Sequence, residues 1–99
     1  MPEYKLVITL KARKEIEYFF EYYKSISEEV YEEFIFDIDI AYNSLIKIPK
    51  LYRKRYLDYR RINFHKFPIM FVYLIVENTN TVKLMACYHQ SSEPKKFYK

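Results

Sequence analysis

Two apolar runs in the second half of the chain constrain the fold more than any other feature. They span residues 69–76 and 82–88, and the polar segment Glu77-Asn78-Thr79-Asn80-Thr81 separates them. Apolar runs joined by a short polar segment are typical of a β-hairpin, and asparagine readily adopts the turn conformations that glycine usually provides. The chain of 99 residues contains no glycine. Asn, Asp, Pro or longer loops therefore have to form every tight turn.

The first half has the pattern of one short strand followed by two helices. Residues 5–9 are apolar enough for a strand, and Thr9 can cap the helix that follows it. A second helix is expected to begin after Ser25 or Ser27 and to end before Pro49. Two helices joined by so short a break should form an antiparallel hairpin. The residues expected to face the sheet are Ile16, Phe19, Phe20, Phe34, Ile38, Tyr42 and Leu45.

The pattern after Pro49 changes from helix to strand. Residues 53–64 alternate, with Arg53, Arg55, Tyr59 and Arg61 on one parity and Ile62 and Phe64 on the other. Pro68 then restarts the chain into residues 69–76, which are apolar on both faces and therefore suit a central strand. In the last strand we expect two faces, one with Val82, Leu84, Ala86 and Tyr88 and the other with Lys83, Met85, Cys87 and His89.

This order, β-α-α-β-β-β, predicts an α+β fold in a single domain that spans residues 1–99. The sheet is expected to be mostly antiparallel, with the helical hairpin packed on one of its faces. The inner face should be formed by Ile62, Val82, Leu84 and Ala86, which meet the apolar stripes of the two helices.

The charge is distributed unevenly along the chain. Residues 1–49 hold 6 Lys/Arg and 10 Asp/Glu, whereas residues 50–99 hold 11 Lys/Arg and 3 Asp/Glu. A basic second half suits an anionic partner such as nucleic acid, although an acidic protein or a merely solvated face would fit as well. The single cysteine, Cys87, suits a reducing cytoplasm, and no apolar run reaches the ~18 residues of a membrane-spanning helix.

Several short motifs resemble the RelE/ParE superfamily of toxins from bacterial type II toxin–antitoxin systems, which includes plasmid stabilisation proteins. The second half supplies Arg60-Arg61, Phe67-Pro68-Ile69, Tyr73 and His89-Gln90-Ser91-Ser92-Glu93-Pro94-Lys95-Lys96-Phe97. The first half supplies Thr9-x-x-Ala12-x-x-Glu15-Ile16 and Leu45-x-x-x-Pro49. The resemblance covers nearly the whole chain and implies the same order of helices and strands.

The resemblance implies a growth-inhibiting toxin that binds an antitoxin in a hetero-oligomer. The first expectation is a ribosome-dependent mRNA endonuclease (mRNA interferase) that needs no metal or other cofactor. Alternatives are a ParE-like inhibitor of DNA gyrase and a catalytically weak basic module that mainly binds its antitoxin. A metal-free ribonuclease needs an acid, a base and cations around the reacting phosphate. Expected catalytic residues are Arg61, His89 and Tyr98, and expected nucleic-acid-binding residues are Arg55, Arg60, Lys66, Lys95 and Lys96.

Each of these residues also has a simpler interpretation. The arginines between residues 53 and 61 can form the solvated face of an edge strand, and residues 95–99 can be a frayed tail. His89 can hydrogen-bond the turn that follows its strand, and His65 lies in a loop without a clear role. Two departures from the family pattern weaken the nuclease hypothesis, because Ser92 stands where the family often has Arg and Ile69 where it often has Tyr.

Overall fold

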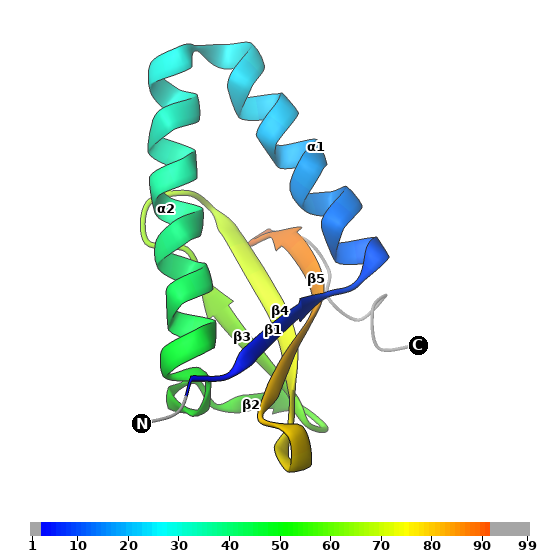
Figure 1. The fold of residues 1–99 in the computed structure, drawn as a ribbon. Coiled ribbons are helices and arrows are strands. Elements are labelled where there is room, and N and C mark those ends of the chain that lie inside the picture. Colours follow the sequence, from blue (N-terminus) through cyan, green and yellow to red (C-terminus); the bar gives the residue numbers. More distant parts are fainter. Residues whose placement is uncertain (1–2, 92–99) are drawn as a thin grey trace.

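The computed structural model describes residues 3–91 of the chain. Two helices, α1 (Leu10–Ile26) and α2 (Glu28–Lys47), follow the first strand and lie together on one face of a sheet (Figure 1). The five strands are β1 (Lys5–Ile8), β2 (Lys54–Tyr56), β3 (Tyr59–Asn63), β4 (Ile69–Val76) and β5 (Thr81–His89). Short 3₁₀ turns, η1 (Pro49–Leu51) and η2 (Glu77–Thr79), follow α2 and β4.

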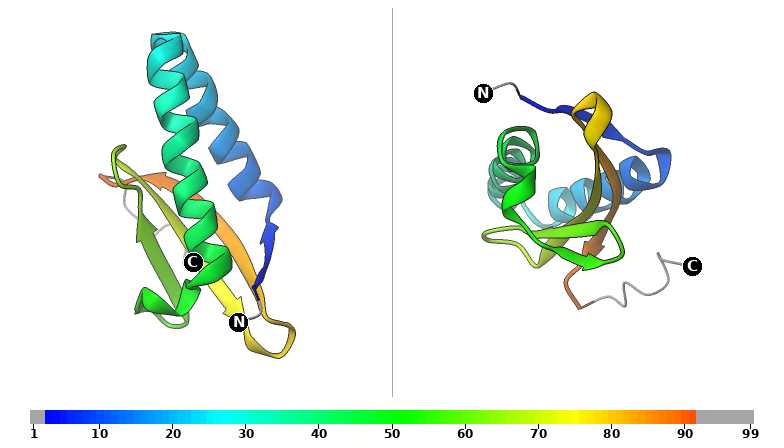
Figure 2. Two further views of the ribbon diagram at one scale, coloured as in Figure 1. Left: turned by 60° about the vertical axis from the view of Figure 1, so that its left-hand side comes forward. Right: turned by 90° about the horizontal axis from the view of Figure 1, so that it is seen from below.

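The helix boundaries lie where the predicted caps place them. The Thr9 side chain accepts a hydrogen bond from the Ala12 N–H, which satisfies one free donor at the start of α1. Ser27 is the only residue between the helices, and its side chain accepts from the Val30 N–H at the start of α2. Ser27 is extended at φ −171°, which turns the chain sharply between two helices. The tip of this hairpin projects beyond the sheet (Figures 1 and 2).

The sheet is open and mixed, with the strand order β1-β5-β4-β3-β2. β1 pairs parallel to β5, and all other neighbours are antiparallel. The predicted α+β class and the helical hairpin on a mostly antiparallel sheet are therefore confirmed. The prediction of a single strand over residues 53–64 was wrong, because a turn at Leu57 and Asp58 divides that segment into β2 and β3.

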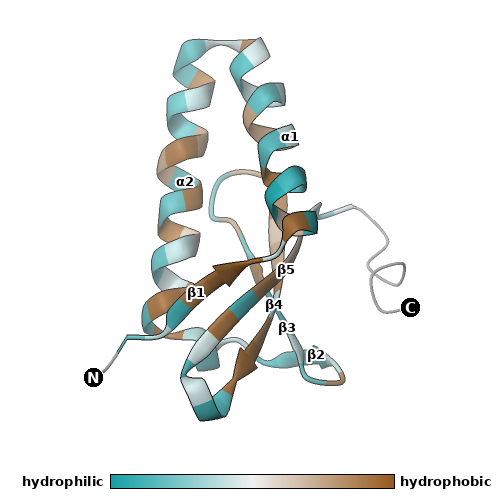
Figure 3. Ribbon diagram, turned by 45° about the vertical axis from the view of Figure 1, so that its right-hand side comes forward, coloured by the Kyte–Doolittle hydropathy of each residue, from teal (hydrophilic) through white to brown (hydrophobic). Residues whose placement is uncertain are grey.

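A core of aromatic and aliphatic side chains lies between the helices and the sheet. Phe34 of α2 is fully buried and contacts four other rings, those of Phe20, Tyr23, Phe64 and Phe67. Hydrophobic bands recur along both helices between hydrophilic ones, as expected for helices with one buried face (Figure 3). The predicted inner residues lie in this core or pack against it, with the exception of Ala86.

A β-bulge in β5 explains the exception. Val72 of β4 pairs with Ala86, but the next residue, Tyr73, pairs with Leu84, so Met85 has no partner in β4. An extra residue reverses the alternation of side chains beyond it. Leu84 therefore faces the helices, whereas Ala86 points to the opposite, outer face of the sheet. The prediction that Val82, Leu84, Ala86 and Tyr88 share one face was wrong for this reason.

Candidate functional site

All charged side chains on the five strands are cationic. The strand sequences contain no Asp or Glu, and their Lys and Arg residues are Lys5, Lys54, Arg55, Arg60, Arg61 and Lys83. The two helices hold most of the carboxylates instead. The charge asymmetry seen along the sequence thus becomes a separation in space between a basic sheet and an acidic helical hairpin.

Arg61 lies on the outer face of the sheet, on β3. Its neighbour in β3, Ile62, is buried in the core, so alternation directs Arg61 away from the helices. Arg61 pairs with Val72 of β4, and Val72 pairs with Ala86 of β5, which forms a row of three residues across the sheet. Arg61 is half-buried and makes no ion pair or side-chain hydrogen bond with any other residue between 3 and 91. No carboxylate of the described residues therefore neutralises this cation.

The other predicted basic residues occupy separate places. Arg60 faces the helix side and donates a hydrogen bond to the Tyr52 carbonyl at 2.6 Å, so it holds the chain before β2. Arg55 is exposed on the edge strand β2. Lys66 forms an ion pair with Glu33 of α2, with 2.6 Å between Nζ and Oε2. Lys95, Lys96 and Tyr98 lie outside the described residues.

His89 lies on the opposite side of the sheet from Arg61. It pairs with Ile69, a core residue, and it lines a cavity together with residues of α1 such as Tyr18 and Tyr22. The prediction that His89 lies on the face of the last strand opposite Val82 and Leu84 was therefore wrong. The bulge at Met85 is the physical reason, because it moves Cys87 and His89 from the outer face to the helix side.

The hydrogen bonds of His89 favour its simpler interpretation. Its Nδ1 accepts the Ser91 N–H at 3.2 Å and lies 2.8 Å from the Ser91 hydroxyl, so the ring holds the turn after β5. A nitrogen that accepts a backbone N–H carries no proton, which assigns the ring proton to Nε2 in the neutral state. The cavity beside it has a volume of about 570 Å³ and is otherwise lined by aromatic rings, Ile26 and Pro68.

Residues at the start of α1 stabilise the bulge. β1 pairs with β5 only as far as Leu84, which leaves the edge of β5 open beyond that point. The Thr9 hydroxyl donates to the Met85 carbonyl at 3.3 Å, and the Cys87 N–H donates to Glu15 Oε1 at 2.9 Å. These two contacts satisfy backbone groups that a continued β1 would have paired.

Lys11 extends this network to the outer part of β5. Its Nζ donates to Glu15 at 2.7 Å and to the Tyr88 hydroxyl at 3.1 Å. Desolvation lowers the pKa of Lys11, but its hydrogen bonds to Glu15 and Tyr88 outweigh this effect and leave that pKa raised. Burial, reinforced by the Glu15 carboxylate, raises the pKa of the Cys87 thiol, so Cys87 is protonated and unreactive at neutral pH.

The sequence interpretation missed two surface hollows. One is the aromatic cavity beside His89, and the other is a groove of about 520 Å³ between α2 and the loop that joins β3 to β4. Both are lined by apolar residues spaced one helical turn apart outside the core stripe: Tyr18, Tyr22 and Ile26 on α1, and Phe36 and Ile40 on α2. That spacing was visible in the sequence and could have identified both hollows.

Within residues 3–91, no cluster of three or more His, Cys, Asp or Glu side chains is suited to hold a metal ion. No helix in that part of the chain is long and apolar enough to cross a membrane. No protein-family model matches the chain, and a search of curated proteins finds no match. The function is therefore inferred from the arrangement of the residues and from the resemblance of their motifs.

Proposed function

We propose that this chain is a RelE/ParE-type toxin of a type II toxin–antitoxin pair and that it cleaves mRNA on the ribosome. The observation that carries this proposal is the charge on the sheet: its strands hold six Lys or Arg side chains and no carboxylate, and of these Arg61 and Lys83 lie on the outer face whereas Arg60 lies on the helix side. A rigid surface with one sign of charge attracts a polyanion and keeps acidic side chains away from its phosphates.

Arg61 is the residue best placed to hold the reacting phosphate. Its strand fixes the position of its backbone, its neighbours Val72 and Ala86 are small and apolar, and no carboxylate of the described residues neutralises it. A guanidinium can donate two parallel hydrogen bonds to phosphate oxygens. In RNA cleavage the 2′-hydroxyl loses its proton and attacks the adjacent phosphorus, and the bond from phosphorus to the 5′-oxygen of the next nucleotide breaks as that oxygen gains a proton. Arg61 would stabilise the negative charge that develops on the phosphate oxygens. Arg55 and Lys83 would bind the flanking phosphates.

The proton transfers of this reaction need groups other than His89. His89 lies on the helix side of the sheet and uses Nδ1 for the turn at Ser91. Tyr98, Lys95 and Lys96 remain the sequence-predicted candidates for the outer face, and we propose Tyr98 as the proton-transferring group.

Binding without cleavage is the second candidate function, either as a gyrase inhibitor or as a basic module held by its antitoxin. The separation of Arg61 from His89 favours it, because it removes the expected acid–base residue from the basic face. Ser92 in place of the family arginine points the same way.

A cleavage assay with purified ribosomes, a defined mRNA and primer extension tests the first candidate. We expect cleavage by the wild-type chain and its loss in Arg61→Ala. Arg13→Ala is the matched control, since it removes the same charge from an exposed position on α1. A gyrase supercoiling assay on the same proteins tests the second candidate. A chain that neither cleaves mRNA nor inhibits gyrase nor slows growth when expressed alone contradicts the toxin assignment.

A further inference from the structure

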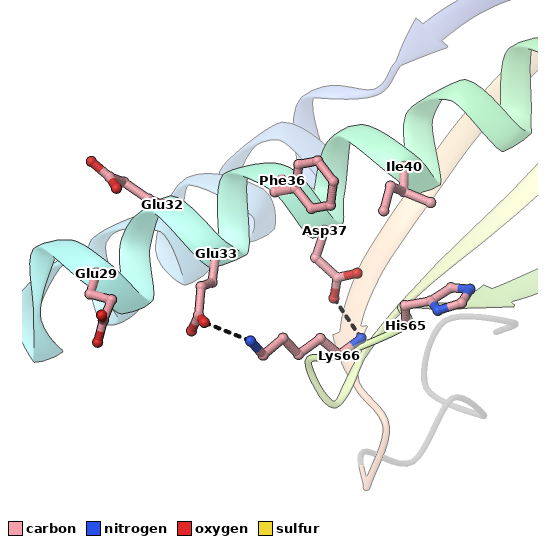
Figure 4. A pocket seen from close by; sticks show the side chains of 8 residues that line it. All are labelled: Glu29, Glu32, Glu33, Phe36, Asp37, Ile40, His65 and Lys66. Atoms are coloured by element: carbon pink, nitrogen blue, oxygen red, sulfur yellow. Dashed lines mark hydrogen bonds and ion pairs between the residues drawn. The ribbon is translucent and has the colours of Figure 1, made fainter.

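The groove between α2 and the β3–β4 loop has the properties of a docking site. Residues of α2 between Glu29 and Ile40 form one wall, and His65 and Lys66 of the loop form the other (Figure 4). Its volume is about 520 Å³, and it lies away from the basic face of the sheet that carries Arg61. A ligand in this groove would therefore not compete directly for the proposed RNA site.

The apolar part of the groove is formed by side chains that nothing in the described chain covers. Phe36 is 71% exposed and Ile40 is 38% exposed, although both are large and apolar. They lie one turn apart on α2, on a different side of the helix from the buried Phe34 and Ile38. Exposed apolar side chains that line a hollow, rather than being scattered singly, mark a surface for a partner.

The other groove residues on α2 are acidic, on a chain whose net charge is +4. Glu29 and Glu32 are exposed and make no ion pair with another described residue. Glu33 holds Lys66, which leaves that cation neutralised. Asp37 is buried, and its Oδ2 accepts hydrogen bonds from two backbone N–H groups, whereas its Oδ1 has no hydrogen-bond donor among the described residues. The groove therefore offers several carboxylate oxygens to an incoming cation.

The shape of the groove indicates a helical ligand. Glu29, Glu33, Phe36 and Ile40 are spaced by four, three and four residues, which places them along one stripe of α2. At 1.5 Å per residue that stripe is about 16 Å long, or about three helical turns. The acidic residues lie toward the start of α2, and the apolar pair lies toward its middle.

We propose that this groove binds a basic amphipathic helix of a partner protein. Two aliphatic side chains of that helix would pack on Phe36 and Ile40, and Lys or Arg side chains one or two turns away would meet Glu29 and Glu32. Charge complementarity identifies the partner, because a net basic chain repels other basic proteins except at this acidic patch. Amphipathic helices that lie in grooves are bound through anchors with this spacing. The site is independent of the proposed nuclease chemistry.

The test uses a fluorescein-labelled, alanine-based helical peptide with two leucines one turn apart, followed by three arginines. Fluorescence anisotropy with the whole chain measures the Kd, and amide chemical shifts locate the peptide. We expect shifts at Phe36, Ile40, His65 and Lys66. A peptide with glutamates in place of the arginines should not bind. The absence of binding by the arginine peptide at roughly millimolar concentrations, where even weak helix docking is detectable, overturns the proposal.

Matched variants separate a specific site from general attraction. Glu29→Gln with Glu32→Gln should raise the Kd about three- to thirty-fold, the range expected for two exposed ion pairs. Glu17→Gln with Glu21→Gln removes the same charge from exposed positions on α1 and should leave the Kd nearly unchanged. Equal losses in both double variants overturn the proposal.

Phe36→Ala should weaken binding about ten-fold. If wild type forms dimers by sedimentation and Phe36→Ala does not, a second copy is the occupant and the proposal fails.

Discussion

Asp37 offers the sharpest test of how the helical hairpin is attached to the sheet. It is 3% exposed, and its Oδ2 accepts hydrogen bonds from the Lys66 and Phe67 N–H groups, both at 2.9 Å. These bonds fix the β3–β4 loop against α2. They also hold Phe67 in the core, where its ring contacts Phe34 at a centroid distance of 5.2 Å. One buried carboxylate thus links a helix to a loop about 30 residues away in sequence.

Replacing Asp37 with Ala should be strongly destabilising. A hydrogen bond to a charged group contributes about 1.5–3 kcal/mol, and the change leaves two N–H donors without a partner. Water can reach part of the loop, so we expect a loss of about 3–5 kcal/mol in the free energy of unfolding. For a domain of this size that corresponds to a melting temperature lower by about 15–30 °C. Asp37→Asn keeps one acceptor oxygen in place and should cost about 1–2 kcal/mol.

Urea unfolding followed by circular dichroism measures these differences. Asp39→Ala is the matched control, because Asp39 is exposed on the same helix and its side chain makes no hydrogen bond or ion pair with another residue between 3 and 91. Hydrogen exchange provides a second measurement, since the Lys66 and Phe67 amides should lose protection selectively in the Asp37 variants. If Asp37→Ala unfolds within about 0.5 kcal/mol of wild type, the loop is not held by this carboxylate, and the reasoning fails.

Three further predictions follow from burial and from the position of the bulge. Phe34→Ala should lower the free energy of unfolding by about 3–5 kcal/mol, and a wild-type melting temperature would show that Phe34 does not lie in the core. Burial raises the pKa of Tyr42 to about 12, and it also raises the pKa of Cys87. The folded state therefore keeps protons that the unfolded chain loses. Stability should be fully present below about pH 9 and fall from there toward pH 12, with a smaller fall in Tyr42→Phe. His89→Ala should retain mRNA cleavage, whereas a decrease of about 10²–10⁴-fold in the cleavage rate would show that His89 is catalytic.

Local sequence patterns predicted the features that local interactions decide. Thr9 was predicted as the first cap, and Ser25 or Ser27 as the second, because a hydroxyl before an apolar helical repeat commonly caps a helix. The side chains of Thr9 and Ser27 accept the expected N–H groups. The β4–β5 connection was predicted from its asparagines, and Asn80 has the left-handed conformation, with φ 48°, that this turn requires. The boundaries of β4 agree with its apolar run, because that run ends where the polar segment of the turn begins.

The β2–β3 turn was missed because Leu57 carries no turn signal and Asp58, a common turn residue, stands alone beside it. Leu57 has φ 50°, a conformation that costs a non-glycine residue energy and that leucine rarely adopts. Here the turn places leucine where glycine or asparagine would fit at a lower cost. The alternation of arginines on both sides of Leu57 therefore resembled one continuous strand. Leu57→Gly should relieve this local cost without altering the pairing of β2 with β3.

The bulge at Met85 shows why the candidate site was only partly predictable. Arg61 was placed correctly on the outer face because alternation in β3 is unbroken from Tyr59 to Asn63. His89 was misplaced because its face depends on one extra residue in β5, and that residue is stabilised by Thr9 and Glu15, over 70 positions away. No local pattern records such a contact. A strand-end residue can therefore be assigned to a face only when every pairing before it is known, and this limit applies wherever a motif such as His89-Gln90-Ser91 follows a long edge-exposed strand.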